Sequence, residues 1–188
     1  MSKITIIPCV DITRPVESAK HYNHTGADAI AYYDKEVSID TIKAIKEVID
    51  VPLYAGGGIK DLEDVKKVLY AGADKICLGA TVLVDKDIVK KASDRFGKSQ
   101  VIVSMDLEQM DAPDEFAKEM ERLGAGELLL LANHGYDKTE EAVKAVKSQV
   151  TLPVIVSVAS TDDIVETLEV TNAESISIHD AGTFSVLG

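Results

Sequence analysis

The sequence predicts an α/β fold, in which residues 1–188 form a single domain, a minimal (β/α)₈ TIM barrel. Strand signals alternate strictly with helix signals, eight strands can be distinguished, and the connections between them are short. Strict alternation implies parallel strands joined by right-handed crossovers. Eight strands favour a closed barrel over an open doubly wound sheet, which usually has fewer. The chain is well below the roughly 250 residues typical of this barrel, so its loops must be short.

The predicted strands are apolar runs rich in β-branched residues, as expected for strands buried on both faces of a parallel sheet. They cover about residues 4–11, 28–33, 53–55, 75–79, 101–106, 127–132, 153–157 and 174–179.

Seven amphipathic helices are predicted between these strands. They cover about residues 14–25, 38–49, 61–70, 85–96, 112–123, 139–149 and 161–171. Side-chain oxygens that can cap helix N-termini are supplied by Ser38 or Asp40, by Asp61 and by Thr161. Residues 180–188 are too few and too glycine-rich for a full helix, so the final helix of the barrel is expected to be missing.

The two halves of the chain resemble each other, which predicts two (β/α)₄ half-barrel repeats at about 1–97 and 98–188. The matching segments are 26–28 with 124–126, 51–53 with 152–154, and 73–77 with 173–177. Asp11 and Asp106 then occupy equivalent positions, on opposite walls of one barrel mouth.

Asp11 and Asp106 are the candidate catalytic residues, because each is predicted to end a buried strand. The carboxyl ends of the strands are where barrels of this kind hold their catalytic groups. The alternative is a structural role, in which each aspartate only caps the helix that follows it.

Composition excludes several function classes. The net charge of −12 argues against nucleic acid and anionic membranes as partners. No apolar run approaches the roughly 20 residues of a membrane span, and the N-terminus has no signal-peptide pattern. Cys9 and Cys77 lack metal-ligand spacing, so we expect small core residues in a reduced, cytoplasmic chain with no metal and no cofactor.

Five stretches distributed over nearly the whole chain resemble the HisF/HisA family of histidine biosynthesis, and HisF more closely. They are residues 6–11 (IIPCVD), 54–59 (YAGGGI), 71–75 (AGADK), 94–97 (DRFG) and 123–130 (LGAGELLL). The resemblance implies a lyase, the cyclase of imidazole glycerol phosphate synthase. Such an enzyme takes a phosphorylated ribulose-type substrate and ammonia, which a glutaminase subunit supplies. It also implies that Asp11 and Asp106 are the general acid and base.

A phosphate-binding site is expected at the turns after the third and fourth strands. Glycine allows backbone N–H groups to approach an anion, and a helix N-terminus favours negative charge. The residues assigned to it are Gly56, Gly57, Gly58, Gly79, Ala80 and Thr81. The alternative is a tight strand-to-helix turn that binds nothing.

This chain departs from the family pattern in its loops and at the second phosphate site. Residues 12–15 lead almost directly into a helix, so the family's long loop with its catalytic lysine is missing. Ser157-Val158-Ala159 and His179-Asp180 stand where small residues are expected. We expect His134 and His179 near the mouth, and for His179 a satisfied polar contact is favoured over an acid/base cluster with Asp180 and Asp11.

The family also has a ring of four charges at the barrel floor, of which this chain keeps Lys75 and Glu127 as an expected ion pair. Thr5 and Ala29 hold the other two positions, which argues against coupling to a glutaminase subunit.

The missing final helix predicts an uncovered apolar strip on the outer faces of strands 8 and 1. Its residues are Ile4, Ile6, Ile176 and Ile178, and we expect a homo-oligomer to form through them. Two other functions stay open beside the cyclase. One is a pared, non-catalytic barrel, natural or engineered, that keeps one phosphate-binding turn; the other is a HisA-like sugar isomerase.

Overall fold

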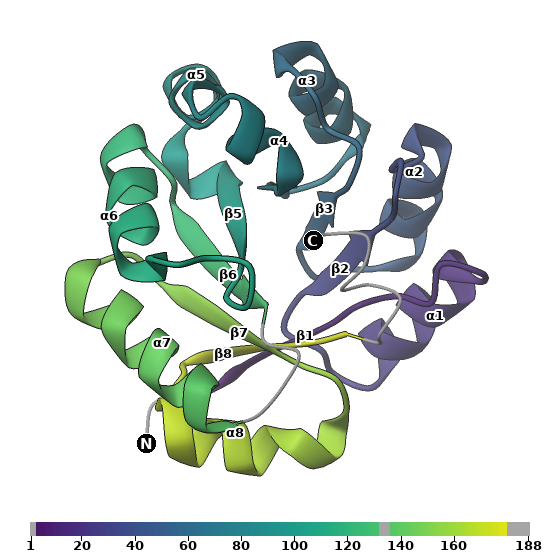
Figure 1. The fold of residues 1–188 in the computed structure, drawn as a ribbon. Coiled ribbons are helices and arrows are strands. Elements are labelled where there is room, and N and C mark those ends of the chain that lie inside the picture. The colour runs from purple at the N-terminus through teal and green to yellow at the C-terminus, as the bar shows by residue number, and fades with distance from the viewer. Residues whose placement is uncertain (1–2, 132–135, 180–188) are drawn as a thin grey trace.

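The computed structural model describes residues 3–131 and 136–179, and these form an eight-stranded parallel barrel surrounded by helices (Figure 1). The predicted TIM barrel is confirmed. The strands are β1 (Thr5–Pro8), β2 (Ile30–Tyr33), β3 (Leu53–Gly56), β4 (Lys75–Leu78), β5 (Val101–Asp106), β6 (Glu127–Leu131), β7 (Val154–Val158) and β8 (Ser175–Ile178).

The sheet closes between β1 and β2. Seven neighbouring pairs of strands run in the order β1-β8-β7-β6-β5-β4-β3-β2. The remaining gap is bridged by Cys9 and Ala31, with hydrogen bonds from Val10 N to Ala31 O (2.9 Å) and from Asp28 N to Ile6 O (3.1 Å). Counted in either direction around the barrel, β5 is therefore four strands away from β1.

The helices alternate with the strands as the sequence predicts, with one addition. They are α1 (Pro15–His24), α2 (Ile39–Val48), α3 (Leu62–Ala71), α4 (Ala80–Val84), α5 (Asp87–Phe96), α6 (Pro113–Leu123), α7 (Tyr136–Gln149) and α8 (Ile164–Thr171). The sequence analysis missed the five-residue α4. The expected absence of a final helix concerns residues 180–188, which lie outside the described residues.

Two of the predicted N-caps are confirmed and one is wrong. Ser38 Oγ accepts a hydrogen bond from Thr41 N (3.2 Å), and Asp61 Oδ1 accepts one from Asp64 N (2.9 Å). The segment before α8 begins instead with a 3₁₀ turn capped by Ser160, not Thr161, because the Ser160 hydroxyl accepts a hydrogen bond from Asp162 N (3.1 Å).

Alternation along the strands separates two apolar clusters, one inside the barrel and one between the sheet and the helices. The inner cluster consists of Ile7, Ala29, Ala31, Tyr33, Tyr54, Cys77, Ile102, Leu129, Leu131 and Ile155, with Cys9 packed against it. Aromatic and aliphatic side chains thus fill the interior of the barrel.

The predicted apolar strip on the outside of β8 and β1 is largely covered. Ile176 is completely buried, and Ile6 and Ile178 are partly buried against the same outer cluster. Ile4, the remaining residue of the strip, is exposed. The expectation that this strip is open was therefore wrong at Ile176.

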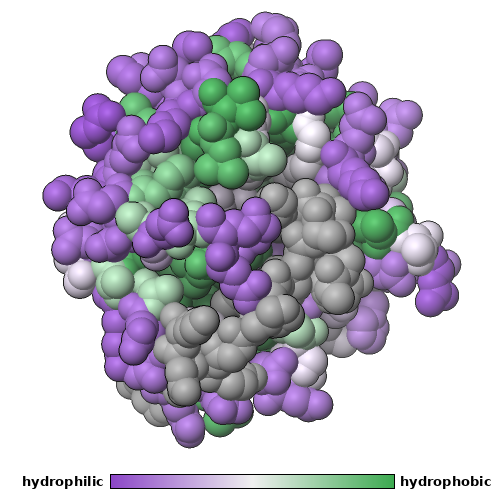
Figure 2. Space-filling view, viewed as in Figure 1, coloured by the Kyte–Doolittle hydropathy of each residue, from purple (hydrophilic) through white to green (hydrophobic). Residues whose placement is uncertain are grey.

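The surface is predominantly polar at the periphery. In Figure 2, hydrophilic residues form the outer rim of the face shown, and hydrophobic residues appear nearer the middle and toward the top. Among the described residues, no helix combines the length and the apolar character that a membrane crossing requires.

Candidate active site

Asp11 lies in the turn between β1 and α1 rather than at the end of a strand. The strand was predicted to reach residue 11, but β1 ends at Pro8 and Cys9 adds only an isolated bridge. The chain then turns, with a hydrogen bond from Arg14 N to Asp11 O (3.1 Å). Asp11 is consequently exposed at the mouth.

The Asp11 carboxylate is held by its own turn. Its Oδ1 accepts hydrogen bonds from Thr13 N (2.9 Å) and Thr13 Oγ1 (2.7 Å). The Asp11 amide also donates to Ser18 Oγ at the start of α1 (3.0 Å). The hydrogen bonds from the Thr13 side chain and backbone lower the pKa of Asp11, so this carboxyl is ionised at neutral pH.

Asp106 is the last residue of β5, as predicted, and is partly buried. Its Oδ1 accepts from Glu108 N (3.0 Å) and its Oδ2 from Gln109 Nε2 (2.8 Å). Each of the two aspartates therefore binds the backbone N–H two residues further on, the pattern of an Asx turn. Asp11, in the turn after β1, and Asp106, at the end of β5, thus both lie at the carboxyl end of the barrel, and β1 and β5 are opposite strands.

The three glycines at the end of β3 are required by close packing: Gly56, buried in β3, lies against Cys77 of β4, and Gly57 and Gly58 lie against the loop after β2. Gly57 and Gly58 have φ angles of 109° and 70°. A Cβ on Gly57 would lie 1.5 Å from Asp34 O, and a Cβ on Gly56 would lie 2.8 Å from Cys77 O. Val37 N also donates to Gly57 O (3.2 Å). The glycine run is thus explained without a ligand.

The two segments predicted to bind phosphate do lie side by side. The Thr81 hydroxyl donates to Lys60 O (3.4 Å), which joins the start of α4 to the turn before α3. Gly57, Gly79 and Thr81 are partly exposed, and Gly58 and Ala80 are exposed. Their backbone is therefore accessible from the mouth.

A polar cluster inside the mouth was missed by the sequence analysis, which interpreted both cysteines as core residues. Cys77 is buried, but Cys9 is only partly buried, and its Sγ lies 3.3 Å from His179 Nδ1 and 3.7 Å from Ser177 Oγ. The His179 ring is 1% exposed and stacks on Tyr33, with 5.7 Å between ring centroids and 7° between planes. His134 and Asp180 lie outside the described residues.

The opposite end of the barrel holds the predicted ion pair. Lys75 Nζ lies 2.8 Å from Glu127 Oε1, and the ammonium is 5.0 Å from the centre of the Tyr54 ring. Burial opposes the charge of Lys75, but the hydrogen bond and the charge of Glu127 outweigh it and raise the pKa of Lys75. Ala29 is buried among the inner residues, so it adds no charge to this floor.

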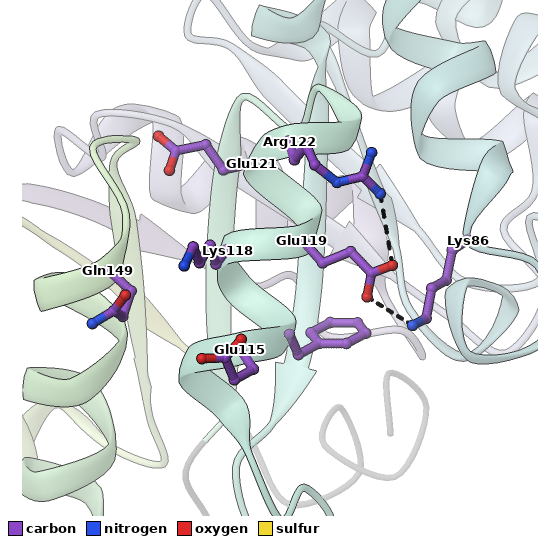
Figure 3. Close-up of a pocket in the computed structure, with 8 residues that line it drawn as sticks. Lys86, Glu115, Lys118, Glu119, Glu121, Arg122 and Gln149 are labelled. Carbon is purple, nitrogen blue, oxygen red and sulfur yellow. Dashed lines mark hydrogen bonds and ion pairs between the residues drawn. The ribbon is translucent and has the colours of Figure 1, made fainter.

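An open groove on the outside of the barrel follows α6 (Figure 3). Glu119 forms ion pairs with Lys86 (2.7 Å) and with Arg122 (3.9 Å), and Phe116 and Gln149 also line the groove. It lies on the helical layer and not at the mouth, so we do not assign it to the site. Among residues 3–131 and 136–179, no group of three His, Cys, Asp or Glu side chains could hold a metal ion.

Comparison with known protein families matches residues 9–178 to the family described as "Histidine biosynthesis protein". The chain belongs to this family. It is 33% identical to the imidazole glycerol phosphate synthase subunit HisF of Endomicrobium trichonymphae, over 84% of this chain and 78% of the relative. The HisF subunit of Sulfurisphaera tokodaii is 34% identical, over 76% of this chain and 68% of the relative.

The relatives are longer within the matched region. The HisF subunit of Exiguobacterium sp. is 29% identical to this chain. The alignment covers 97% of this chain and 91% of the relative, and it runs over 233 positions. Since this chain has 188 residues, the relative carries internal segments that are absent here. The short connection between β1 and α1 agrees with this difference.

Proposed function

We propose that this chain is a HisF-like lyase/cyclase, which forms imidazole glycerol phosphate from a phosphorylated ribulose-type substrate and ammonia. The observation that carries the proposal is the position of Asp11 and Asp106 at one barrel mouth, after β1 and at the end of β5, which are opposite strands, in a chain of the histidine biosynthesis family. Ring closure requires that one proton is removed and another delivered on different sides of a bound intermediate. Two opposed carboxylates fit that requirement.

We assign the general-base role to Asp11. Its pKa is lowered by the hydrogen bonds from Thr13, so it is a carboxylate at neutral pH, although the same shift makes it a weaker base. Its exposure allows a substrate to reach it. Asp106, partly buried at the end of β5, is the second carboxyl group of the pair.

The phosphate of the substrate is assigned to the turns that contain Gly56–Gly58 and Gly79–Thr81. The contact between Thr81 and Lys60 O brings the two turns together, and their backbone N–H groups can hydrogen-bond an anion. Lys60 and Lys35 are exposed nearby along the chain, whereas the Glu36 side chain packs close to Gly58 and weakens this attraction.

A partner subunit is suggested by the HisF relatives, since each is named a subunit of a synthase, and the family resemblance of the sequence implies that this partner would be a glutaminase that supplies ammonia. The floor of this barrel carries one ion pair, Lys75 with Glu127, instead of a ring of four charges. We therefore propose that this chain can use free ammonium as its nitrogen donor. A first assay supplies ammonium, and a second one tests a glutaminase partner.

A pared, non-catalytic barrel is the second candidate, and one observation favours it. Both aspartates are engaged by hydrogen bonds from their own turns, and the glycines are explained by packing. A HisA-like sugar isomerase would use the same pair of aspartates on a different phosphorylated sugar.

The deciding experiment supplies the ribulose-type substrate with ammonium chloride and identifies the products by mass spectrometry. Formation of imidazole glycerol phosphate supports the cyclase, and an isomerised sugar phosphate supports the isomerase. Absence of any turnover by folded protein, with inorganic phosphate still perturbing the Gly57 and Gly79 amides in NMR spectra, would leave the non-catalytic barrel.

A further inference from the structure

We propose that Cys9 is a reactive thiol, activated by His179, and is the site at which soft electrophiles modify this protein. The sulfur lies 3.3 Å from His179 Nδ1 and 3.9 Å from Nε2, so Nδ1 is the nearer proton acceptor. A thiol beside an imidazole can transfer its proton to the ring, and the resulting thiolate is the nucleophilic form.

The ring of His179 is oriented by its surroundings. It is stacked on Tyr33 with the two planes only 7° apart, and it is 1% exposed. The Ser177 hydroxyl donates its proton to Ile7 O (3.2 Å). The distance from Ser177 Oγ to the Cys9 sulfur is 3.7 Å, longer than the distance from His179 Nδ1 to the same sulfur. Of these two contacts of the Cys9 sulfur, the one with His179 Nδ1 is therefore the shorter.

The titratable and polar groups of the described residues that face this pair come from several strands. They are Ser177 and His179 on the β8 side, Tyr33 on β2, Cys77 on β4 (whose thiol hydrogen-bonds Tyr33), the more distant Glu127 on β6, and Asp11 two residues after Cys9. Burial raises the pKa of Tyr33 well above its ordinary value, so this phenol stays neutral and adds no charge.

Cys77 provides a control within the same chain. Cys77 also belongs to the cluster inside the barrel, but it is only 1% exposed. Burial raises the pKa of its thiol to about 12, and hydrogen bonds with Ser104 and Tyr33 offset only part of this increase. Cys9 is partly exposed and has a basic nitrogen in contact. Two thiols in one barrel therefore differ in both access and activation.

The reaction with iodoacetamide shows the balance of the step. The Cys9 S–H proton passes to His179 Nδ1, the sulfur lone pair forms a bond to the methylene carbon, and the carbon–iodine bond breaks with its electron pair leaving as iodide. The imidazolium then returns its proton to water. No oxidant is required, and the reactivity is independent of the function proposed above.

The test measures iodoacetamide labelling of the folded protein from pH 5 to 9.5, with peptide mapping by mass spectrometry. We expect labelling at Cys9 with a pH midpoint below the value of about 8.5 for an ordinary thiol, and Cys77 labelled at least tenfold more slowly. His179→Asn should slow Cys9 labelling at pH 7 at least tenfold, whereas Ser177→Ala should change it less than threefold. Circular dichroism checks that both variants are folded.

Two results would overturn the proposal. One is a midpoint for Cys9 at or above about 8.5 in the parent protein, which needs no variant to be folded. The other is a folded His179→Asn protein in which Cys9 is labelled as fast as in the parent.

Discussion

Lys75 and Glu127 are the first residues of β4 and β6, and their side chains meet at 2.8 Å across the floor of the barrel. Their side chains are 28% and 10% exposed, so this pair lies between a surface salt bridge and a fully buried one. Its partners lie on two strands separated by β5, so the contact depends on the pairing of β5 with both neighbours.

Replacing one member of this pair should destabilise the protein. Lys75→Met leaves Glu127 without its hydrogen bond, and we expect a loss of about 1–3 kcal/mol in the free energy of unfolding, between the values for exposed and buried pairs. Lys90→Met is the matched control, because the Lys90–Asp94 pair is more than half exposed on both sides and should cost less than about 0.5 kcal/mol. Urea denaturation measures the free energy of unfolding of both variants and of the parent. An equal loss of stability in Lys75→Met and Lys90→Met would contradict the expectation.

The same pair has a predictable pH dependence. The pKa of Lys75 is raised above 10.5, so its contribution to stability is complete below the pKa of an unfolded lysine. It is lost as the pH rises through the folded-state pKa. The difference in stability between the parent and Lys75→Met should therefore be constant from pH 7 to 10 and shrink only at higher pH, as measured by urea denaturation.

Asp11 should titrate below the ordinary range of an aspartate. The hydrogen bonds from Thr13 lower its pKa below 3.8. Thr13→Val removes the side-chain donor but keeps the backbone N–H, so the pKa of Asp11 should rise toward 3.8 without passing it. An NMR titration of the Asp11 carboxyl carbon measures both values, and Thr41→Val, at a cap remote from Asp11, is the control. A pKa of Asp11 that does not change in Thr13→Val would contradict the assigned cause.

Gly57 should tolerate alanine much less well than Gly26 does. Both have positive φ angles, 109° and 91°, so both substitutions carry the backbone cost of about 1–2 kcal/mol. Only Gly57 adds a collision, because its Cβ would lie 1.5 Å from Asp34 O, whereas nothing lies within 4 Å at Gly26. We expect Gly57→Ala to lose clearly more stability in thermal denaturation than Gly26→Ala. Equal losses would mean that the loop after β2 does not constrain this turn.

The sequence predicted the fold well because each βα unit has its own local signals. The alternation of strands and helices and the caps at Ser38 and Asp61 depend on neighbouring residues only. The short α4 was missed because Gly79, at its N-terminus, offers no side-chain cap. The strand before Asp11 was predicted too long, because apolar residues continue to Val10 after the ladder has ended at Pro8.

The site was predicted less completely because its contacts are not local. Cys9 and His179 are 170 positions apart and meet only when β1 and β8 pair. The packing of Gly57 against Asp34 likewise depends on the loop of another strand. The half-barrel repeat stays a prediction. If it is right, Cys77 corresponds to Ser177 and Gly79 to His179, so the second half carries a histidine where the first half has a glycine.

The most direct test of the proposed chemistry compares the turnover of the parent with that of Asp11→Asn and Asp106→Asn, with the ribulose-type substrate and ammonium chloride. Asparagine keeps the size of the side chain, and its amide oxygen can still accept the backbone N–H of the turn, but it cannot transfer protons. We expect each variant to lose at least a hundredfold in kcat, in the range of general acid–base catalysis. Asp111→Asn, an exposed aspartate beyond the mouth turn, should keep the activity of the parent. Full activity in either folded Asp11→Asn or Asp106→Asn would contradict the central claim.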